Sequence, residues 1–154
     1  MNSLIIYDSL YGNTEKVAKA VGEAVKAKIK SVNEASNEDF KGIDLLIVGS
    51  PTHGGRAKPS LQLFLDQIPA GALKNIKVAT FDTRFLEKDV NFVLRLLIKT
   101  IGYAGPKIAD LLESKGGELF APTEGFIVVK KEGPLKEGEL ERARIWGKQI
   151  FDLL

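Results

Sequence analysis

Short apolar runs alternate with amphipathic segments along this 154-residue chain, and this alternation constrains the fold more than any other feature. The clearest run, Leu45–Gly49, is unbroken, as is typical of a strand buried on both faces of a parallel sheet. Strand–helix alternation of this length predicts an α/β fold, a doubly wound parallel sheet with helices on both faces. Ligands of such sheets bind outside the carboxyl ends of the strands, so the loops there carry the functional hypotheses.

The periodicity predicts the position of each element. The last strand is expected to bend at Pro122 and Gly125, and Asn13 or Thr14 is expected to cap the first helix. No repeat, low-complexity tract or linker interrupts the pattern, so residues 1–154 are expected to form a single domain. The predicted strands cover about residues 4–7, 29–35, 45–49, 76–81 and 119–129. The predicted helices cover about residues 13–28, 59–67, 86–101, 106–114 and 137–154.

Composition excludes several classes of site. The chain has no Cys, which excludes disulfides and thiolate metal sites, and its single His cannot build a histidine-rich metal centre. Carboxylate sites for Mg²⁺ or Ca²⁺ stay open, and none is predicted. The formal net charge of +2 is too balanced to indicate nucleic-acid binding. No stretch has the pattern of a secretory signal or a membrane span, so a cytoplasmic protein is expected.

The loop after the first strand has the chemistry of a phosphate site. It offers two hydroxyls, a glycine that permits close backbone approach, and the unpaired N–H groups of a helix start. A plain strand–turn–helix connection capped by Asn13 is the alternative interpretation. The residues assigned to this site are Ser9, Leu10, Tyr11, Gly12, Asn13 and Thr14.

The sequence from Ser9 to Glu15 resembles the phosphate loop of flavodoxins, usually written S/T-x-T-G-x-T. The resemblance covers nearly the whole chain. It implies a flavodoxin-like three-layer sandwich whose five-stranded parallel sheet has the strand order 2-1-3-4-5. It also implies FMN as the cofactor, with its phosphate on this loop and its ring between the loops that contain His53 and Phe85.

Two features depart from the family pattern. Tyr11 stands where flavodoxins have Thr, and a Tyr-Gly pair at this place is similar to WrbA-type quinone reductases. The sequence pI of about 8.7 also differs from flavodoxins, which are generally acidic. The second departure leaves the identity of any redox partner open.

The loop after the third strand is similar to the loop that borders the flavin edge in flavodoxins and quinone reductases. Its paired glycines let backbone amides approach a planar ring. His53 is expected to stack on the ring or to bond its edge, with a plain surface histidine as the alternative. Arg56 and Lys58 are expected to be solvated, with attraction of an anionic partner as the alternative. The residues assigned to the site are Pro51, Thr52, His53, Gly54 and Gly55.

The segment after the fourth strand is expected to lie beside that loop. By the resemblance, Phe85 is the aromatic of this segment, and packing beneath the next helix is the alternative. Asp82 near the ring would oppose a negative charge on reduced flavin and lower its potential, whereas a turn residue is the alternative. The residues assigned here are Asp82, Thr83, Arg84 and Phe85.

Other features are given ordinary explanations. The run Lys130–Glu132 is expected to be a solvated strand end and turn. A dinucleotide-binding domain would need Gly-x-Gly-x-x-Gly after the first strand, where only Gly12 is present. A phosphoreceiver domain would need an acceptor Asp after the third strand, and Gly49–Pro51 occupies that place.

The favoured function is that of an FMN-binding electron carrier that exchanges electrons with redox partner proteins, without a catalytic residue of its own. One alternative is an NAD(P)H-dependent quinone or FMN reductase. The other is a flavin-free interaction module on the same fold. A monomer is expected, with a dimer as the alternative.

Overall fold

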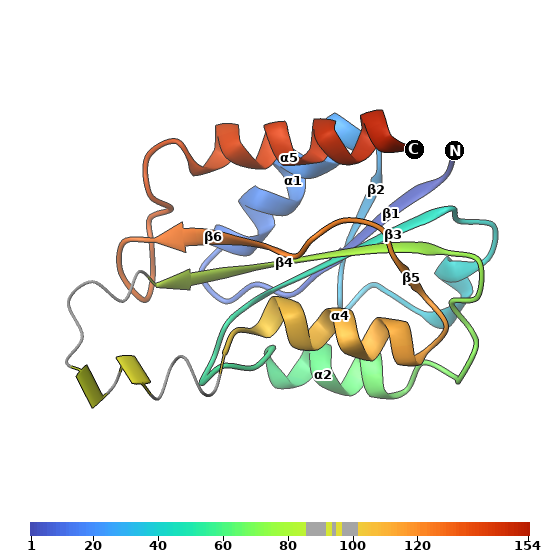
Figure 1. Ribbon diagram of the computed structural model, residues 1–154, viewed down its shortest axis with the longest axis horizontal. Coiled ribbons are helices and arrows are strands. Elements are labelled where there is room, and N and C mark those ends of the chain that lie inside the picture. The colour runs from blue at the N-terminus through green and yellow to red at the C-terminus, as the bar shows by residue number, and fades with distance from the viewer. Residues whose placement is uncertain (86–91, 94, 97–101) are drawn as a thin grey trace.

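Strands and helices follow one another along the chain, and the computed structural model describes residues 1–85, 92–93, 95–96 and 102–154. The strands are β1 (Ser3–Tyr7), β2 (Lys28–Ser31), β3 (Leu45–Pro51), β4 (Lys77–Phe85), β5 (Glu118–Leu119) and β6 (Glu124–Val128). The helices are α1 (Asn13–Val25), the 3₁₀ helix η1 (Asn37–Phe40), α2 (Pro59–Asp66), α4 (Ala104–Ser114) and α5 (Glu139–Leu153). A parallel sheet separates α1 and α5 on one face from α2 and α4 on the other (Figure 1).

The strand order is β2-β1-β3-β4-β5, and β6 also pairs with β4, every pair being parallel. The predicted parallel sheet and its order are thereby confirmed. The predicted fifth strand is divided into β5 and β6, and the break includes Pro122, which has no N–H for the ladder. Gly125 lies within β6, whose pairing with β4 is continuous from Glu124 to Val128, so the strand is not interrupted at this glycine. A Cβ added there would lie 2.3 Å from Cζ of Arg84, so the guanidinium occupies that space.

Helix α1 is bounded by two residues with positive φ, and both ends differ from the prediction. Gly12, with φ of 89°, holds the N-cap position without a side-chain hydrogen bond, so the predicted cap by Asn13 or Thr14 is wrong. At the other end Lys26 has φ of 54° and ends the helix before Lys28, the residue predicted as its end. Lys28 instead begins β2.

Strand β4 is longer than predicted. It continues to Phe85, so the segment 80–85, predicted as a loop, belongs to the strand. The pairing with β6 extends from Phe81 to Phe85 and supplies the partner that local sequence does not reveal. Strand β2 is shorter than predicted and ends at Ser31, where a turn begins.

The predicted helix over residues 86–101 falls mostly outside the described residues. Residues 92–93 and 95–96, which the structure describes, are helical and exposed. Within the described ranges, no helix combines the length and the apolar character needed to cross a bilayer.

Apolar side chains fill both sides of the sheet. On the side of α1 and α5, the rings of Phe81, Phe126 and Trp146 meet edge to face, with centroids 6.0, 6.1 and 6.2 Å apart. Gly49 of β3 lies directly beside Phe81, because a Cβ added at Gly49 would lie 2.1 Å from the ring. The glycine therefore makes room for the largest aromatic cluster of the core.

Strand β2 forms one edge of the sheet. It is four residues long, and Lys28 on it is exposed. Lys30, the second lysine of the strand, forms an ion pair with Asp39 of η1 at 2.7 Å. The 3₁₀ helix thus packs a charged pair against this edge.

Glu139 fastens the first turn of α5 to β6. Its largely buried carboxylate accepts the Ile127 N–H at 2.6 Å and the Arg142 Nε–H at 2.9 Å. Burial alone would raise the pKa of Glu139, but the hydrogen bonds from Arg142 and Ile127 hold that pKa below its usual range. The fold therefore stabilises the ionised carboxylate of Glu139 relative to its protonated form.

Acid is expected to weaken the fold through this carboxylate. Because the pKa of Glu139 is lowered by folding, its stabilisation is complete above the ordinary carboxyl value of about 4.3 and is lost as the pH falls through the lowered value. We expect Glu139→Gln to cost about 2 kcal/mol at pH 7 and to flatten the fall in stability below pH ~4. Urea unfolding at a series of pH values measures both effects. The exposed neighbour Glu137 provides the control, Glu137→Gln, and equal slopes for the two variants would contradict this account.

Candidate functional site

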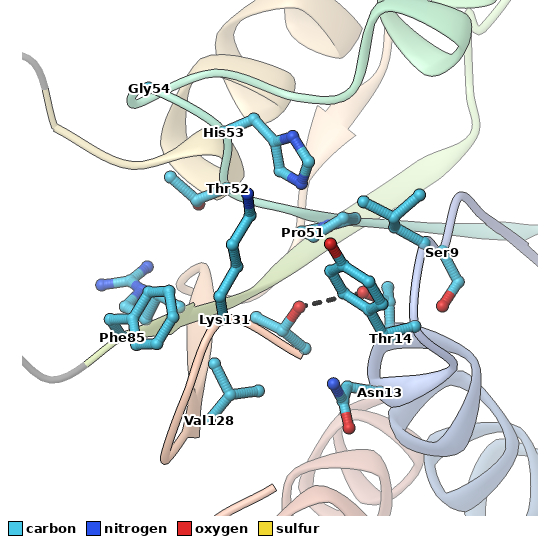
Figure 2. A pocket seen from close by; sticks show the side chains of 14 residues that line it. Ser9, Asn13, Thr14, Pro51, Thr52, His53, Gly54, Phe85, Val128 and Lys131 are labelled. Atoms are coloured by element: carbon cyan, nitrogen blue, oxygen red, sulfur yellow. Dashed lines mark hydrogen bonds between the residues drawn. The ribbon is translucent and has the colours of Figure 1, made fainter. Parts of the chain in front are cut away.

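A cavity of about 390 Å³ lies at the carboxyl ends of β1, β3 and β4 (Figure 2). Parallel α/β sheets bind their ligands at this end. Three segments far apart in the sequence meet there, as predicted, and a fourth joins them. The lining residues are Ser9, Leu10, Tyr11, Asn13, Thr14, Pro51, Thr52, His53, Gly54, Thr83, Arg84, Phe85, Val128 and Lys131.

The first segment brings the start of α1 to the cavity. Gly12 turns the chain with its positive φ, and its N–H donates to Ser9 Oγ at 3.0 Å. The hydroxyls of Thr14 and Thr83 are hydrogen-bonded at 2.9 Å, which ties this segment to β4. Helix N-terminal N–H groups and hydroxyls are donors suited to an anion. Since the cap residue supplies no side-chain acceptor, an incoming anion would meet the first turn directly.

The second segment is a tight turn from His53 to Arg56. The two residues exchange backbone hydrogen bonds, with N···O distances of 2.8 and 3.0 Å. Gly54 and Gly55 have φ of 55° and 77°, as a type I′ turn requires. Lys107 of α4 donates to the Gly55 carbonyl at 2.6 Å and holds the turn in place. In Figure 2, His53 projects from this hydrogen-bonded turn to the cavity.

Thr52 fastens the second segment to the rest of the site. Its N–H donates to the Thr83 carbonyl at 2.9 Å, and its Oγ1 accepts the N–H of Ala104, the first residue of α4, at 3.0 Å. The threonine therefore caps a helix from another part of the chain. Both bonds fix the height of the turn above the sheet.

Asp82 lies beneath the cavity and outside its lining. It is completely buried in β4, so its interpretation as a turn residue is wrong. Its carboxylate accepts Arg84 Nε–H and Nη2–H, each at 2.6 Å, and the Gly105 N–H at 2.9 Å. The Arg84 guanidinium also stacks on Tyr103, with Cζ 3.6 Å from the ring centroid. The pair is thus a neutral clamp between β4 and α4.

Lys58 was predicted to be solvated, and this prediction is wrong. Its ammonium lies 3.0 Å from the nearly buried carboxylate of Asp8, which also accepts the hydroxyl of Ser60. The charge of Lys58 is therefore used within the fold, where it supports the end of β1. Arg56 is exposed, in agreement with the prediction.

The fourth segment contributes Val128 and Lys131, which sequence reasoning missed. The Asn13 amide donates to the Glu132 carbonyl at 3.1 Å and holds this segment against the start of α1. Gly133 permits the contact, because a Cβ there would lie 2.7 Å from the Asn13 side chain. No local motif marks these residues. The run Lys130–Glu132 is a turn with exposed side chains, as predicted, but one of them reaches the cavity.

The apolar rim of the cavity is exposed. Leu10, Tyr11 and Phe85 are 49%, 45% and 45% accessible, although side chains of this kind are usually buried. A flat ligand in the cavity would cover them. Phe85 lines the cavity, while most of the helix predicted to follow it lies outside the described residues. Of the fifteen residues assigned from the sequence, all line the cavity except Gly12, Gly55 and Asp82.

Comparison with known proteins agrees with this geometry. Residues 4–116 match the family model described as a flavodoxin domain. A protein of Methanocaldococcus jannaschii is 28% identical over 152 residues, which span 98% of this chain and 99% of that protein. A flavodoxin of Clostridium saccharobutylicum is 26% identical over 157 residues, spanning 97% and 95% of the two chains. The structure of oxidised flavodoxin 1 from Bacillus cereus has a TM-score of 0.76 at 15% identity, covering 100% of this chain and 99% of that one, and so shares the fold.

Proposed function

Because this chain belongs to the flavodoxin family, we propose that it binds FMN in the cavity and carries electrons between redox proteins. One observation carries the proposal. The start of α1, with its hydroxyl and amide donors, and an exposed apolar rim converge on the same cavity of about 390 Å³. A cofactor with an anionic tail and a planar ring matches both parts.

The residues present suit the two ends of FMN. Ser9, Thr14 and the first turn of α1 would bind the phosphate, as donors without a formal charge. His53 and Phe85 would border the ring, and the hydrogen-bonded His53–Arg56 turn would present backbone amides to its edge. Tyr11 lies on the exposed rim. The phosphate donors proposed here are Ser9, Thr14 and the first turn of α1, and they do not include the hydroxyl that flavodoxins have at position 11. The cofactor supplies the redox chemistry, while the protein binds and orients it.

Titration of FMN fluorescence tests this proposal. We expect Ser9→Ala and Thr14→Ala each to weaken FMN binding about tenfold, because each removes a hydroxyl donor to a charged phosphate. Riboflavin lacks the phosphate, and its affinity is expected to stay within about twofold of the wild-type value. Ser114→Ala, which removes an exposed hydroxyl at the end of α4, is the matched control.

Thr14 also has a structural bond to Thr83, so its variants need a second readout. Thr14→Ser retains a hydroxyl and is expected to recover FMN binding, while thermal unfolding reports on the fold. Equal affinities of the wild type for FMN and riboflavin would remove the phosphate assignment. Absence of FMN binding would reject the carrier and leave a flavin-free interaction module.

A reductase that takes a hydride from NAD(P)H is the second candidate. The Tyr11–Gly12 pair favours it through its similarity to WrbA-type quinone reductases. Anaerobic mixing of the FMN-loaded protein with NADH or NADPH separates the two candidates. Slow or absent loss of flavin absorbance supports the carrier, and rapid loss supports the reductase.

A further inference from the structure

The charged side chains that line the cavity are both cationic. They are Arg84 and Lys131, and no carboxylate belongs to the described lining. The two cations are not equivalent. Arg84 is neutralised by Asp82, with its Nη2 2.6 Å from the carboxylate, whereas no ion pair of Lys131 is found within the described ranges. Lys131 therefore supplies the net charge of this lining.

The segment that carries Lys131 is anchored at several points. The Asn13 amide holds the Glu132 carbonyl, and the Gly133 N–H closes a turn on the Lys130 carbonyl at 2.9 Å. The residues on either side of the turn are also joined, because the Val129 N–H donates to the Pro134 carbonyl at 2.9 Å. These bonds fix the backbone of Lys131 at the cavity. The side chain of Lys131 thus starts from a fixed point on the wall of the cavity.

The direction of the Lys131 side chain distinguishes the two ends of the cavity. In Figure 2 it extends toward Thr52 and His53, away from Ser9 and Asn13. The first pair belongs to the end where the ring would lie, and the second pair to the phosphate end. The ammonium therefore lies nearer to the proposed ring position than to the proposed phosphate position.

We propose that Lys131 selects the redox state of the cofactor by stabilising reduced FMN over oxidised FMN. This inference rests on the proposed function. Two electrons and one proton convert the neutral oxidised ring into a reduced ring with one negative charge. A nearby ammonium stabilises that charge by Coulomb attraction and does little for the neutral ring. Asp82, expected from the sequence to lower the potential, is paired with Arg84, so the charge left without an ion pair in the described lining is that of Lys131.

The size of the effect follows from exposure. Lys131 is exposed, so solvent and salt screen its charge. We expect Lys131→Gln to weaken binding of reduced FMN about fivefold and to leave oxidised FMN within about twofold. Fivefold corresponds to a two-electron potential lower by about 20 mV. The difference should shrink between 0.1 and 1 M salt, as the Debye length falls from about 10 to about 3 Å.

The experiment compares the two affinities in the same protein. Fluorescence quenching gives the dissociation constant of oxidised FMN. The potentials of free and bound FMN, measured anaerobically with dithionite against a reference dye, then give the constant for reduced FMN. The quantity compared is the affinity for reduced FMN divided by the affinity for oxidised FMN. Lys131→Arg retains the charge and should retain the wild-type ratio. Lys131→Glu should lower the ratio further than Lys131→Gln does. Lys130→Gln removes an adjacent exposed lysine outside the cavity lining and is the matched control.

Each outcome decides the proposal. Selective loss of reduced FMN in Lys131→Gln, with recovery in Lys131→Arg, supports it. An unchanged ratio overturns it, as does equal weakening of both redox states with riboflavin unaffected, which would assign the ammonium to the phosphate. Lys131→Met is a second neutral variant if Lys131→Gln fails to fold. Failure of the wild type to bind FMN would reject the proposed function itself, a result distinct from binding with an unchanged ratio.

Discussion

Replacing Asp82 by asparagine is expected to lower the free energy of unfolding by about 3 kcal/mol. The side chain keeps its shape, but the Arg84 guanidinium loses the only carboxylate found beside it in the described structure. An asparagine amide group would also place N–H donors against the donors of Arg84 or of Gly105. Removing one partner of a largely buried ion pair is strongly destabilising, because Arg84 loses its carboxylate while its side chain stays only 20% exposed.

Urea unfolding followed by circular dichroism measures this loss. Asp66→Asn changes an exposed carboxylate at the end of α2 and should cost less than about 0.5 kcal/mol. Adding Arg84→Met to Asp82→Asn removes the unpaired charge and should recover part of the stability. If the single variant were as stable as wild type, the pair would not clamp β4 to α4.

A methyl group added at Gly49 is expected to cost about 3 kcal/mol, because it has no space beside Phe81. The ring cannot simply retreat, since it is fully buried and packed against Phe126 and Trp146. Trp146 is the single tryptophan of the chain and stands in the affected cluster. Its fluorescence therefore reports the disturbance directly during unfolding.

Two further variants separate crowding from backbone effects. Gly49→Ala with Phe81→Leu should be more stable than Gly49→Ala alone, because the smaller side chain vacates the space. Gly42→Ala has an open surrounding and φ of 71°, so it should show only the backbone cost, about 1 kcal/mol. A Gly49→Ala variant with native stability and native Trp146 fluorescence would contradict the crowding.

The layered architecture could be predicted because its signals are local. An unbroken apolar run such as Leu45–Gly49 and apolar residues at helical spacing each reflect what the chain buries. The ends of the helices and strands were harder to predict. Gly12 as the cap of α1 and Lys26 as its end depend on positive φ values, which residue type alone does not specify. The length of β4 depends on its pairing with β6, a contact between distant parts of the chain.

The site, too, has parts that local sequence predicts and parts that depend on distant contacts. Its first two loops could be assigned because hydroxyls, glycines and a helix start follow strands directly. Asp82 is a residue type common in turns, but here it is a buried counterion. Its partners, Arg84 and the Gly105 N–H of α4, are not revealed by the local sequence. Lys131 was missed for a similar reason. It reaches the cavity only because the Asn13 amide and the space left by Gly133 bring its segment to α1.

The edge formed by β2 has a consequence for how the protein behaves at high concentration. Open sheet edges invite strands of other molecules to pair with them, which is a common route to aggregation. A strand added beside β2 would lie next to the exposed Lys28 and the Lys30–Asp39 ion pair, and such charges at an edge disfavour pairing. The short length of β2 also leaves few backbone groups for it to pair with. Charge and short length together make this edge a poor template for a further strand.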